Sequence, residues 1–224
     1  MKVLIYCPMN PIAPRICDRT LDSIFGMRWM HPLDIVFGRE DMPRLPSRPV
    51  AHTNITRKYN DARRMALEGG YDALMTIEAD MIVPDLALLR MSAVAADVVY
   101  GLYSNRHGRH QWLAFQTIGG LDGNYSGHSY SKDPVMCARA WGNVVESVGV
   151  GLGCTLIRRN VLEAIEFRCA PDQQVANDWM LALDVGAAGF TQAHDCGVVC
   201  GHIDGNVVYW PVANGGYRPE KMLS

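Results

Sequence analysis

The sequence predicts a single α/β domain in which a mostly parallel central sheet is flanked by helices. Short apolar runs alternate with amphipathic stretches along the first half of the chain, which is the pattern of a parallel sheet covered by helices. The chain has 224 residues, a length that suits one large domain and is short for two. We therefore expect one domain over residues 1–224, with a first half at 1–103 and a second half at 104–224 that includes a C-terminal tail.

In the first half, strands and helices are expected to alternate. The run VLIYC stops at Pro8 and the run LDIVF stops at Gly38, so each is expected to be a strand that passes into a loop. Asn54 or Thr53 can cap the helix before the third strand. Functional side chains of such sheets lie just beyond the carboxyl ends of the strands. The expected strands are 3–7, 33–37, 73–77 and 97–103, and the expected helices are 17–30, 54–69 and 85–95.

The second half has weaker patterns. Residues 104–147 are rich in glycine, serine and asparagine, so we expect a large loop with short strands. Asn160 can cap a helix that follows a clear apolar strand. The tail from Asp204 is expected to be a loop. The expected strands are 151–159 and one within 190–203, and the expected helices are 160–165 and 177–187.

Composition excludes several classes of protein. The 21 basic and 23 acidic residues give a net charge of −2, so no basic excess directs the chain to nucleic acid or to an anionic membrane. No apolar run approaches the roughly 18 residues of a membrane span, and the N-terminal run is too short for a signal peptide. The seven cysteines are odd in number and irregularly spaced, which is typical of reduced thiols in a cytoplasmic protein. The spacing of Cys196, Cys200 and His202 is not a usual zinc-binding pattern.

Two carboxylates follow the third expected strand. Glu78 and Asp80 flank Ala79 in the segment MTIEADMIVP. In extended backbone, side chains two positions apart point the same way and lie about 7 Å apart. Hard oxygen ligands at that spacing suit Mg²⁺ or Mn²⁺ held between protein and phosphates. The alternative is a solvated loop with two surface acids, but the apolar residues on both sides favour burial, and buried carboxylates need a partner.

Residues 54–89, which contain this acidic segment, resemble the core of the GT-A glycosyltransferases. In that family a helix with arginine and asparagine precedes a strand that ends in an acidic D-x-D-like motif, often followed by a hydrophobic pair and proline. Three further segments resemble the family in the same order along the chain, so that the resemblance spans roughly residues 1–203 and leaves 104–147 unmatched. Residues 148–165 are similar to the acceptor-side segment of the family. Asn177-Asp178-Trp179 is similar to the acidic motif that opens the next helix. Cys200-Gly201-His202 is similar to the segment with a late metal-binding histidine.

The resemblance implies a metal-dependent transfer of a sugar from a nucleoside-diphosphate sugar, such as a UDP- or GDP-sugar, to an acceptor hydroxyl. It implies that Asp80 and His202 hold Mn²⁺ or Mg²⁺, which offsets charge on the diphosphate. Glu78 stands where aspartate is commoner, and is expected to act through water or on the ribose. Asp178 is the candidate catalytic base, with a simple helix cap as the alternative. The acceptor is not specified by the sequence.

Donor and acceptor contacts are also expected. The loops after the first two strands lie where the base and ribose would bind, and Arg57, Asn60 and Arg63 lie near one helix face. A glycine turn lets a sugar approach the backbone, and tryptophan rings can stack on an acceptor or pack in the core. The donor-binding candidates are Pro8, Met9, Asn10, Arg39, Asp41, Arg57, Asn60, Arg63 and Glu78, and the acceptor-binding candidates are Gly151, Gly153, Trp112 and Trp179.

Three other functions fit parts of the sequence. A nucleotidyltransferase uses a similar sheet and a metal, but usually has a glycine-rich basic loop after the first strand, whereas CPMNPIAPR contains no glycine. A non-catalytic nucleotide- or carbohydrate-binding module would keep the fold without the activity. A glycosyltransferase acting on a nucleic-acid base, as in some phage DNA-modifying enzymes, is neither favoured nor excluded by the near-neutral charge.

Overall fold

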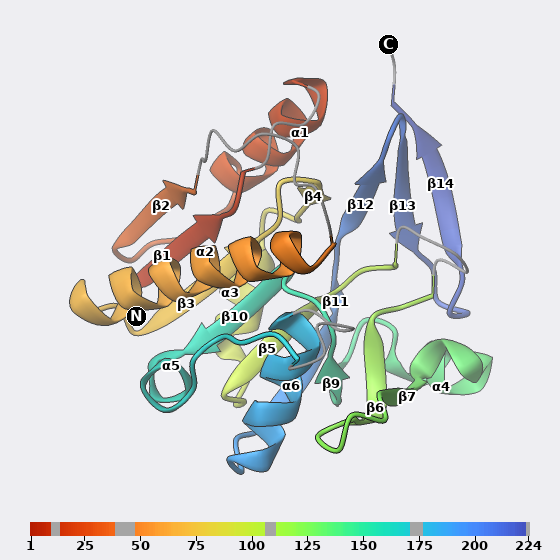
Figure 1. Cartoon of the computed structure of the whole chain (residues 1–224). Helices are drawn as coiled ribbons and strands as arrows, with labels where there is room; N and C mark the ends of the chain where they lie inside the picture. Colours follow the sequence, from red (N-terminus) through yellow and green to blue (C-terminus); the bar gives the residue numbers. More distant parts are fainter. Residues whose placement is uncertain (10–13, 39–47, 106–110, 171–176, 223–224) are drawn as a thin grey trace.

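The structure, a computed structural model, describes residues 1–9, 14–38, 48–105, 111–170 and 177–222. Its centre is a seven-stranded sheet in the order β2-β1-β3-β10-β5-β11-β8 (Figure 1). β10 is antiparallel to both its neighbours and β8 is antiparallel to β11, while the other strands are parallel, which confirms a mostly parallel sheet. The strands are β1 (Val3–Cys7), β2 (Leu33–Phe37), β3 (Ala73–Ile77), β5 (Val98–Leu102), β8 (Val144–Glu146), β10 (Cys154–Arg158) and β11 (Gln192–Val199).

Helices cover both faces of this sheet. Ile5 and Met75, on neighbouring strands, share an apolar cluster with residues of α1 and α3. Leu4 and Leu74 point to the other face and pack with residues of α2, α5 and α6. Because both faces are covered, every residue of the inner strands β1, β3 and β5 is buried, and these strands are mostly apolar, as in other α/β sheets. The helices are α1 (Pro14–Phe25), α2 (Arg48–Glu68), α3 (Ala87–Ala93), α4 (Pro134–Ala140), α5 (Arg159–Ala164) and α6 (Asn177–Ala187), with a 3₁₀ turn η1 (Tyr130–Lys132).

Two smaller sheets extend the domain beyond the central one. The four-stranded sheet has the order β14-β13-β12-β4, and the three-stranded sheet has the order β7-β6-β9. In Figure 1 the four-stranded sheet carries the C-terminal end of the chain. The strands are β4 (Met81–Ile82), β6 (Ala114–Gly119), β7 (Ser126–Ser129), β9 (Val148–Gly149), β12 (Gly201–Asp204), β13 (Val207–Pro211) and β14 (Tyr217–Lys221).

The tail after Asp204 is not a loop, and that expectation is wrong. A turn at Gly205 and Asn206 joins β12 to β13, and β14 then pairs with β13. Gly205 has φ of +58°, the left-handed conformation that tight hairpins need and glycine adopts without strain. The tail therefore completes a sheet that begins with β4, directly after the acidic segment.

Two expected helix caps are also corrected. α2 begins at Arg48, so Thr53 and Asn54 lie inside the helix. Pro49 lies in its first turn, where the missing N–H of proline costs no helical hydrogen bond. The N-cap of α5 is Arg158, without a side-chain cap bond, while the Asn160 amide donates to Asp97 Oδ1 at 2.7 Å. Within the described ranges, no helix has both the length and the apolar character that crossing a bilayer requires.

Candidate functional site

The acidic segment begins where the buried strand β3 ends. The Glu78 N–H donates to the Gly153 carbonyl at 3.1 Å, and the Met81 N–H donates to the Glu78 carbonyl at 3.1 Å. The second bond closes a tight turn from Glu78 to Met81, and the first ties the start of this turn to the segment before β10. The Thr20 hydroxyl of α1 donates to the Ala79 carbonyl at 2.8 Å and holds the turn from the other side. Both carboxylates are therefore presented at the carboxyl end of β3, where ligands of α/β sheets bind.

His202 reaches the same place through strand pairing. β12 runs antiparallel to β4, with His202 opposite Met81. The Ile203 N–H donates to the Asp80 carbonyl at 2.8 Å, which fixes the backbone of the acidic turn against β12. A residue near the end of the chain is thus held beside the acids that follow the third strand of the central sheet.

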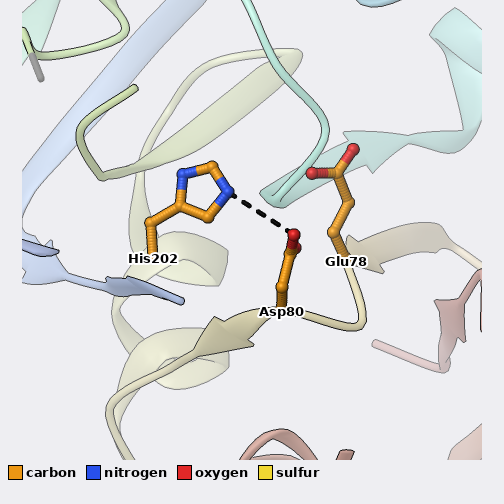
Figure 2. A group of neighbouring side chains, drawn as sticks. All are labelled: Glu78, Asp80 and His202. Atoms are coloured by element: carbon orange, nitrogen blue, oxygen red, sulfur yellow. Dashed lines mark ion pairs between the residues drawn. The ribbon is translucent and has the colours of Figure 1, made fainter. Parts of the chain in front are cut away.

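Glu78, Asp80 and His202 form a compact group of possible metal ligands. One ligand atom from each lies within 4.8 Å of the others, and Figure 2 shows the imidazole directed at the Asp80 carboxylate. His202 Nε2 lies 3.8 Å from Asp80 Oδ2, too far for a hydrogen bond. Nitrogen and oxygen ligands of this kind are able to bind Mn²⁺ or Mg²⁺.

The second imidazole nitrogen determines what Nε2 can do. His202 Nδ1 lies 2.8 Å from the Ser104 carbonyl oxygen, which can only accept, so Nδ1 carries the hydrogen. In the neutral ring Nε2 then has a free lone pair, the arrangement usual for metal-binding histidines. Nε2 is buried and has no hydrogen-bond partner among the residues that the structure describes. Burial lowers the pKa of His202, but the Asp80 carboxylate and the Ser104 carbonyl raise it, and the net shift is upward.

Two buried tyrosines enclose the acids, and the sequence analysis did not identify them. The Tyr59 hydroxyl of α2 lies 3.5 Å from Glu78 Oε1. The Tyr103 ring stands edge-on to the His202 ring, with 5.6 Å between centroids, and its hydroxyl accepts the Gly153 N–H at 3.0 Å. Burial and the Glu78 charge raise the pKa of both tyrosines well above the usual value, so both remain neutral. The only sequence signal for Tyr103 was its place at the end of an expected strand.

Asp178 lies close to this group. It is the second residue of α6, and its Oδ1 accepts the Trp179 N–H at 2.7 Å. Its charge contributes to the raised pKa of Tyr59 and of Tyr103, so the carboxylate lies near both rings. Burial raises the pKa of Asp178, and hydrogen bonds and nearby His52 offset this in part. His52 of α2, which the sequence analysis did not identify, has a buried Nδ1 without a partner among the described residues.

Solved structures share this architecture. The chain matches A197 from STIV with a TM-score of 0.64 and 15% identity, covering 100% of this chain and 95% of that one. It matches S. aureus TarS 1–349 with a TM-score of 0.51 and 10% identity, covering 99% of this chain and 60% of that one. The TarS complex with UDP-GlcNAc matches with a TM-score of 0.50 and 12% identity, covering 97% of this chain and 57% of that one. The chain has a GT-A-like glycosyltransferase fold.

At identities of 10–15%, these comparisons establish the GT-A-like fold. The chain spans about 60% of TarS 1–349. No family model matches the chain, and its sequence matches no curated protein.

The loop after β1 lies at the same edge of the sheet as the acids. Pro8 and Met9 follow β1, which is the neighbour of β3. The Met9 N–H donates to the Gly38 carbonyl at 3.1 Å, and the Lys58 ammonium of α2 donates to the Met9 carbonyl at 3.2 Å. Lys58 is a buried cation that the sequence analysis did not identify. The other candidates in these loops, Asn10, Arg39 and Asp41, lie outside the described residues.

The three candidates on α2 contact other groups. Asn60 exchanges two hydrogen bonds with the backbone of Phe167, at 2.8 and 2.9 Å. Arg63 donates to the Leu162 carbonyl at 2.6 Å and pairs with Glu166. Arg57 pairs with Asp61 at 3.4 Å. Asn60 and Arg63 therefore fasten α2 to α5 and to the chain just after it. These contacts support a structural role in place of the donor contact expected from their spacing.

The glycine turn makes room for a tyrosine. Gly151 has φ of +148°, and a Cβ there would clash with the Tyr103 hydroxyl oxygen. A Cβ on Gly153 would lie 2.9 Å from the same ring. The close approach expected for a sugar is thus made by Tyr103, and the turn acts on the site by positioning that ring and the Glu78 backbone.

The two candidate tryptophans differ. Trp112 is fully buried and packs against Trp141, with 5.9 Å between ring centroids. Its ring has no exposed face, which favours the core role expected for it over stacking on an acceptor. Trp179 is partly exposed, donates from Nε1 to the Gly119 carbonyl at 3.2 Å and meets Phe115 edge-on. Trp179 lies next to Asp178 and stays a candidate for acceptor contact.

Proposed function

We propose that this chain is a metal-dependent glycosyltransferase that moves a sugar from a nucleoside-diphosphate sugar to an acceptor hydroxyl. The proposal rests on Glu78, Asp80 and His202, which meet at the carboxyl end of β3 in a GT-A-like fold. The buried Nε2 of His202, which has no hydrogen-bond partner among described residues, is the observation that carries it. A buried polar atom without a partner is costly, and a bound cation removes that cost.

Asp80 and His202 would hold the cation, and Glu78 would contact it directly, act through water or bind the ribose. Two carboxylates and one imidazole suit Mn²⁺ or Mg²⁺, and the Ser104 carbonyl orients the imidazole for such a role. When bound, a divalent cation offsets the negative charge that develops on the diphosphate leaving group. The UDP-GlcNAc found in the TarS complex is in keeping with a nucleotide-sugar donor.

Asp178 would take the proton from the acceptor hydroxyl. Its pKa is raised by burial, and a carboxylate with a higher pKa is a stronger base. Tyr59 and Tyr103 are neutral, buried rings beside it, and they would keep water from the reacting groups. The Met9 backbone, held by Lys58 and Gly38, would border the nucleotide.

Calorimetric titration tests the donor site. UDP and GDP are titrated into the protein with Mn²⁺, with Mg²⁺ and with EDTA. We expect measurable affinity only with a divalent ion, and loss of that affinity in Asp80→Asn. Asp22→Asn, which changes an exposed carboxylate of α1, is the matched control and should bind as wild type does. Equal affinity in EDTA, or equal affinity in Asp80→Asn, would remove the cation from the proposal.

Turnover separates an enzyme from a binding module. Release of UDP or GDP from their sugar conjugates is measured with Mn²⁺ present, first with water and then with simple sugars as acceptors. A glycosyltransferase releases nucleotide, and Asp80→Asn does not. Tight metal-dependent binding with no release from any UDP- or GDP-sugar would favour the non-catalytic module.

A further inference from the structure

The four-stranded sheet has one face that is already covered by the protein. Ile203, Val208 and Met222 are buried there in an apolar cluster that also includes Ile82 and Trp210. Glu220, on the same face, accepts the Trp210 indole N–H at 2.8 Å and pairs with Arg19 of α1 at 3.2 Å. These contacts attach this face to the body of the domain.

The opposite face carries His202 and two tyrosines. Directly opposed residues of antiparallel strands project to the same side, and Tyr209 of β13 is directly opposite His202 of β12. Tyr217 of β14 is opposite Pro211, two positions along β13 from Tyr209, and therefore lies on the same side. The Tyr209 and Tyr217 rings meet edge-on with 5.4 Å between centroids. We name Tyr209 and Tyr217 the tyrosine pair.

The tyrosine pair begins beside the candidate metal ligands. Directly opposed Cβ atoms in a sheet lie about 5 Å apart, so the Tyr209 side chain starts next to the His202 imidazole. Tyr217 is one diagonal step further out and is 41% exposed. The two rings thus form a surface that leads from the metal ligands toward solvent, over a length comparable to that of one sugar ring.

The charge on this face favours a neutral partner. At its far end Asp204 and Lys221 are each opposite Val207, so this end carries one charge of each sign, on strands two spacings or about 10 Å apart. A nucleic acid needs an excess of lysine and arginine to neutralise its phosphates. A pyranose presents one side of C–H groups and a rim of hydroxyls, which matches tyrosine, with its apolar ring and polar hydroxyl.

We propose that Tyr209 and Tyr217 form the acceptor subsite, and that the acceptor is an uncharged sugar whose C–H face packs on these rings. The proposal rests on the proposed function, because it is the position beside His202 that makes the bound sugar an acceptor. A sugar bound there lies on the solvent side of the metal ligands, where a hydroxyl can approach the donor without crossing the central sheet.

Saturation-transfer NMR tests the subsite. The probes are methyl β-D-glucopyranoside and methyl α-D-mannopyranoside, each measured with and without UDP and Mn²⁺. We expect saturation of ring C–H protons with the wild type for at least one probe, and at least a fivefold loss in Tyr217→Ala. Tyr217→Phe keeps the ring and should keep most of the signal. Arg218→Ala, an exposed position on the other face of the same strand, is the matched control and should resemble wild type.

The outcomes are distinct for the two proposals. Failure of UDP to bind with Mn²⁺ counts against the proposed function, while the sugar signal measured without UDP still decides the subsite. No saturation of either probe by the wild type overturns the subsite, and so does an equal signal in Tyr217→Ala when that variant has the thermal stability of wild type. Binding of a ten-residue oligothymidylate that Tyr217→Ala abolishes, without sugar binding, also overturns it and identifies a nucleic-acid surface.

Discussion

Replacing the Asp178 carboxylate by an amide separates a catalytic base from a residue that only stabilises the start of α6. In the structure Asp178 Oδ1 accepts the Trp179 N–H at 2.7 Å. The asparagine in Asp178→Asn has an oxygen in the same position, and asparagine and aspartate are equally good at helix N-termini. The helix α6 is therefore expected to stay intact, so any loss of activity reports on the proton acceptor.

The expected loss is large. A positioned general base contributes about 10²–10⁴ in rate, and an amide cannot take the proton. Transfer from the donor identified by its metal-dependent binding should fall by that factor in Asp178→Asn, while the affinity for nucleotide with Mn²⁺ changes less than about threefold, or ~0.7 kcal/mol. Nucleotide release is the assay for transfer, and calorimetry measures the binding.

Stability gives a second, independent measurement. Burial raises the pKa of Asp178, so the folded protein holds a proton more tightly there than the unfolded chain does. The free energy of unfolding then falls as the pH rises from the unfolded pKa through the folded pKa, because ionising this partly buried carboxylate opposes folding. Asp178→Asn does not ionise. Its free energy of unfolding relative to wild type should therefore increase over that pH interval and stay level above it, as urea unfolding at several pH values would measure.

Three results would each contradict part of this reasoning. If transfer in Asp178→Asn stays within threefold of wild type, Asp178 is not the base and acts only at the start of α6. Loss of nucleotide binding, with transfer falling only in proportion, would place Asp178 against the donor sugar and away from the acceptor. A stability difference independent of pH would show that the carboxylate is solvated.

Three further predictions follow from the same contacts. Asp80→Asn should lower transfer by far more than threefold at unchanged thermal stability, because the cation loses a charged ligand; activity within threefold, under ~0.7 kcal/mol of barrier, contradicts this. His52→Gln removes a neighbour that lowers the pKa of Asp178, so the acid limb of the rate profile should move to higher pH, and an unmoved limb would separate His52 from the base. Tyr103→Phe leaves the buried Gly153 N–H without its acceptor, so urea denaturation should show a loss of about 1–3 kcal/mol in the free energy of unfolding. The control Tyr71→Phe changes a largely exposed hydroxyl and should cost under about 1 kcal/mol. Equal costs would contradict the role given to Tyr103.

The strands and helices were largely predictable because their signals are local. The expected strands at 3–7, 33–37 and 73–77 and the helix at 177–187 coincide with β1, β2, β3 and α6. The same local pattern predicts Glu78 and Asp80 as candidates, because they are polar residues at the end of an apolar strand. The local pattern does not predict the start of α2, because Pro49 in its first turn continues the run of prolines expected to form a loop.

The site as a group was decided by the tertiary structure. The resemblance pointed to His202, but only the pairing of β4 with β12 brings it to Asp80, and that pairing depends on the hairpin formed by a tail expected to be a loop. The burial of Trp112 and the packing of Tyr103 against Gly151 also depend on neighbours that are distant in sequence. A strand or helix is determined by the periodicity of adjacent residues, whereas these contacts are determined by which sheet edges and apolar faces meet when the whole chain packs.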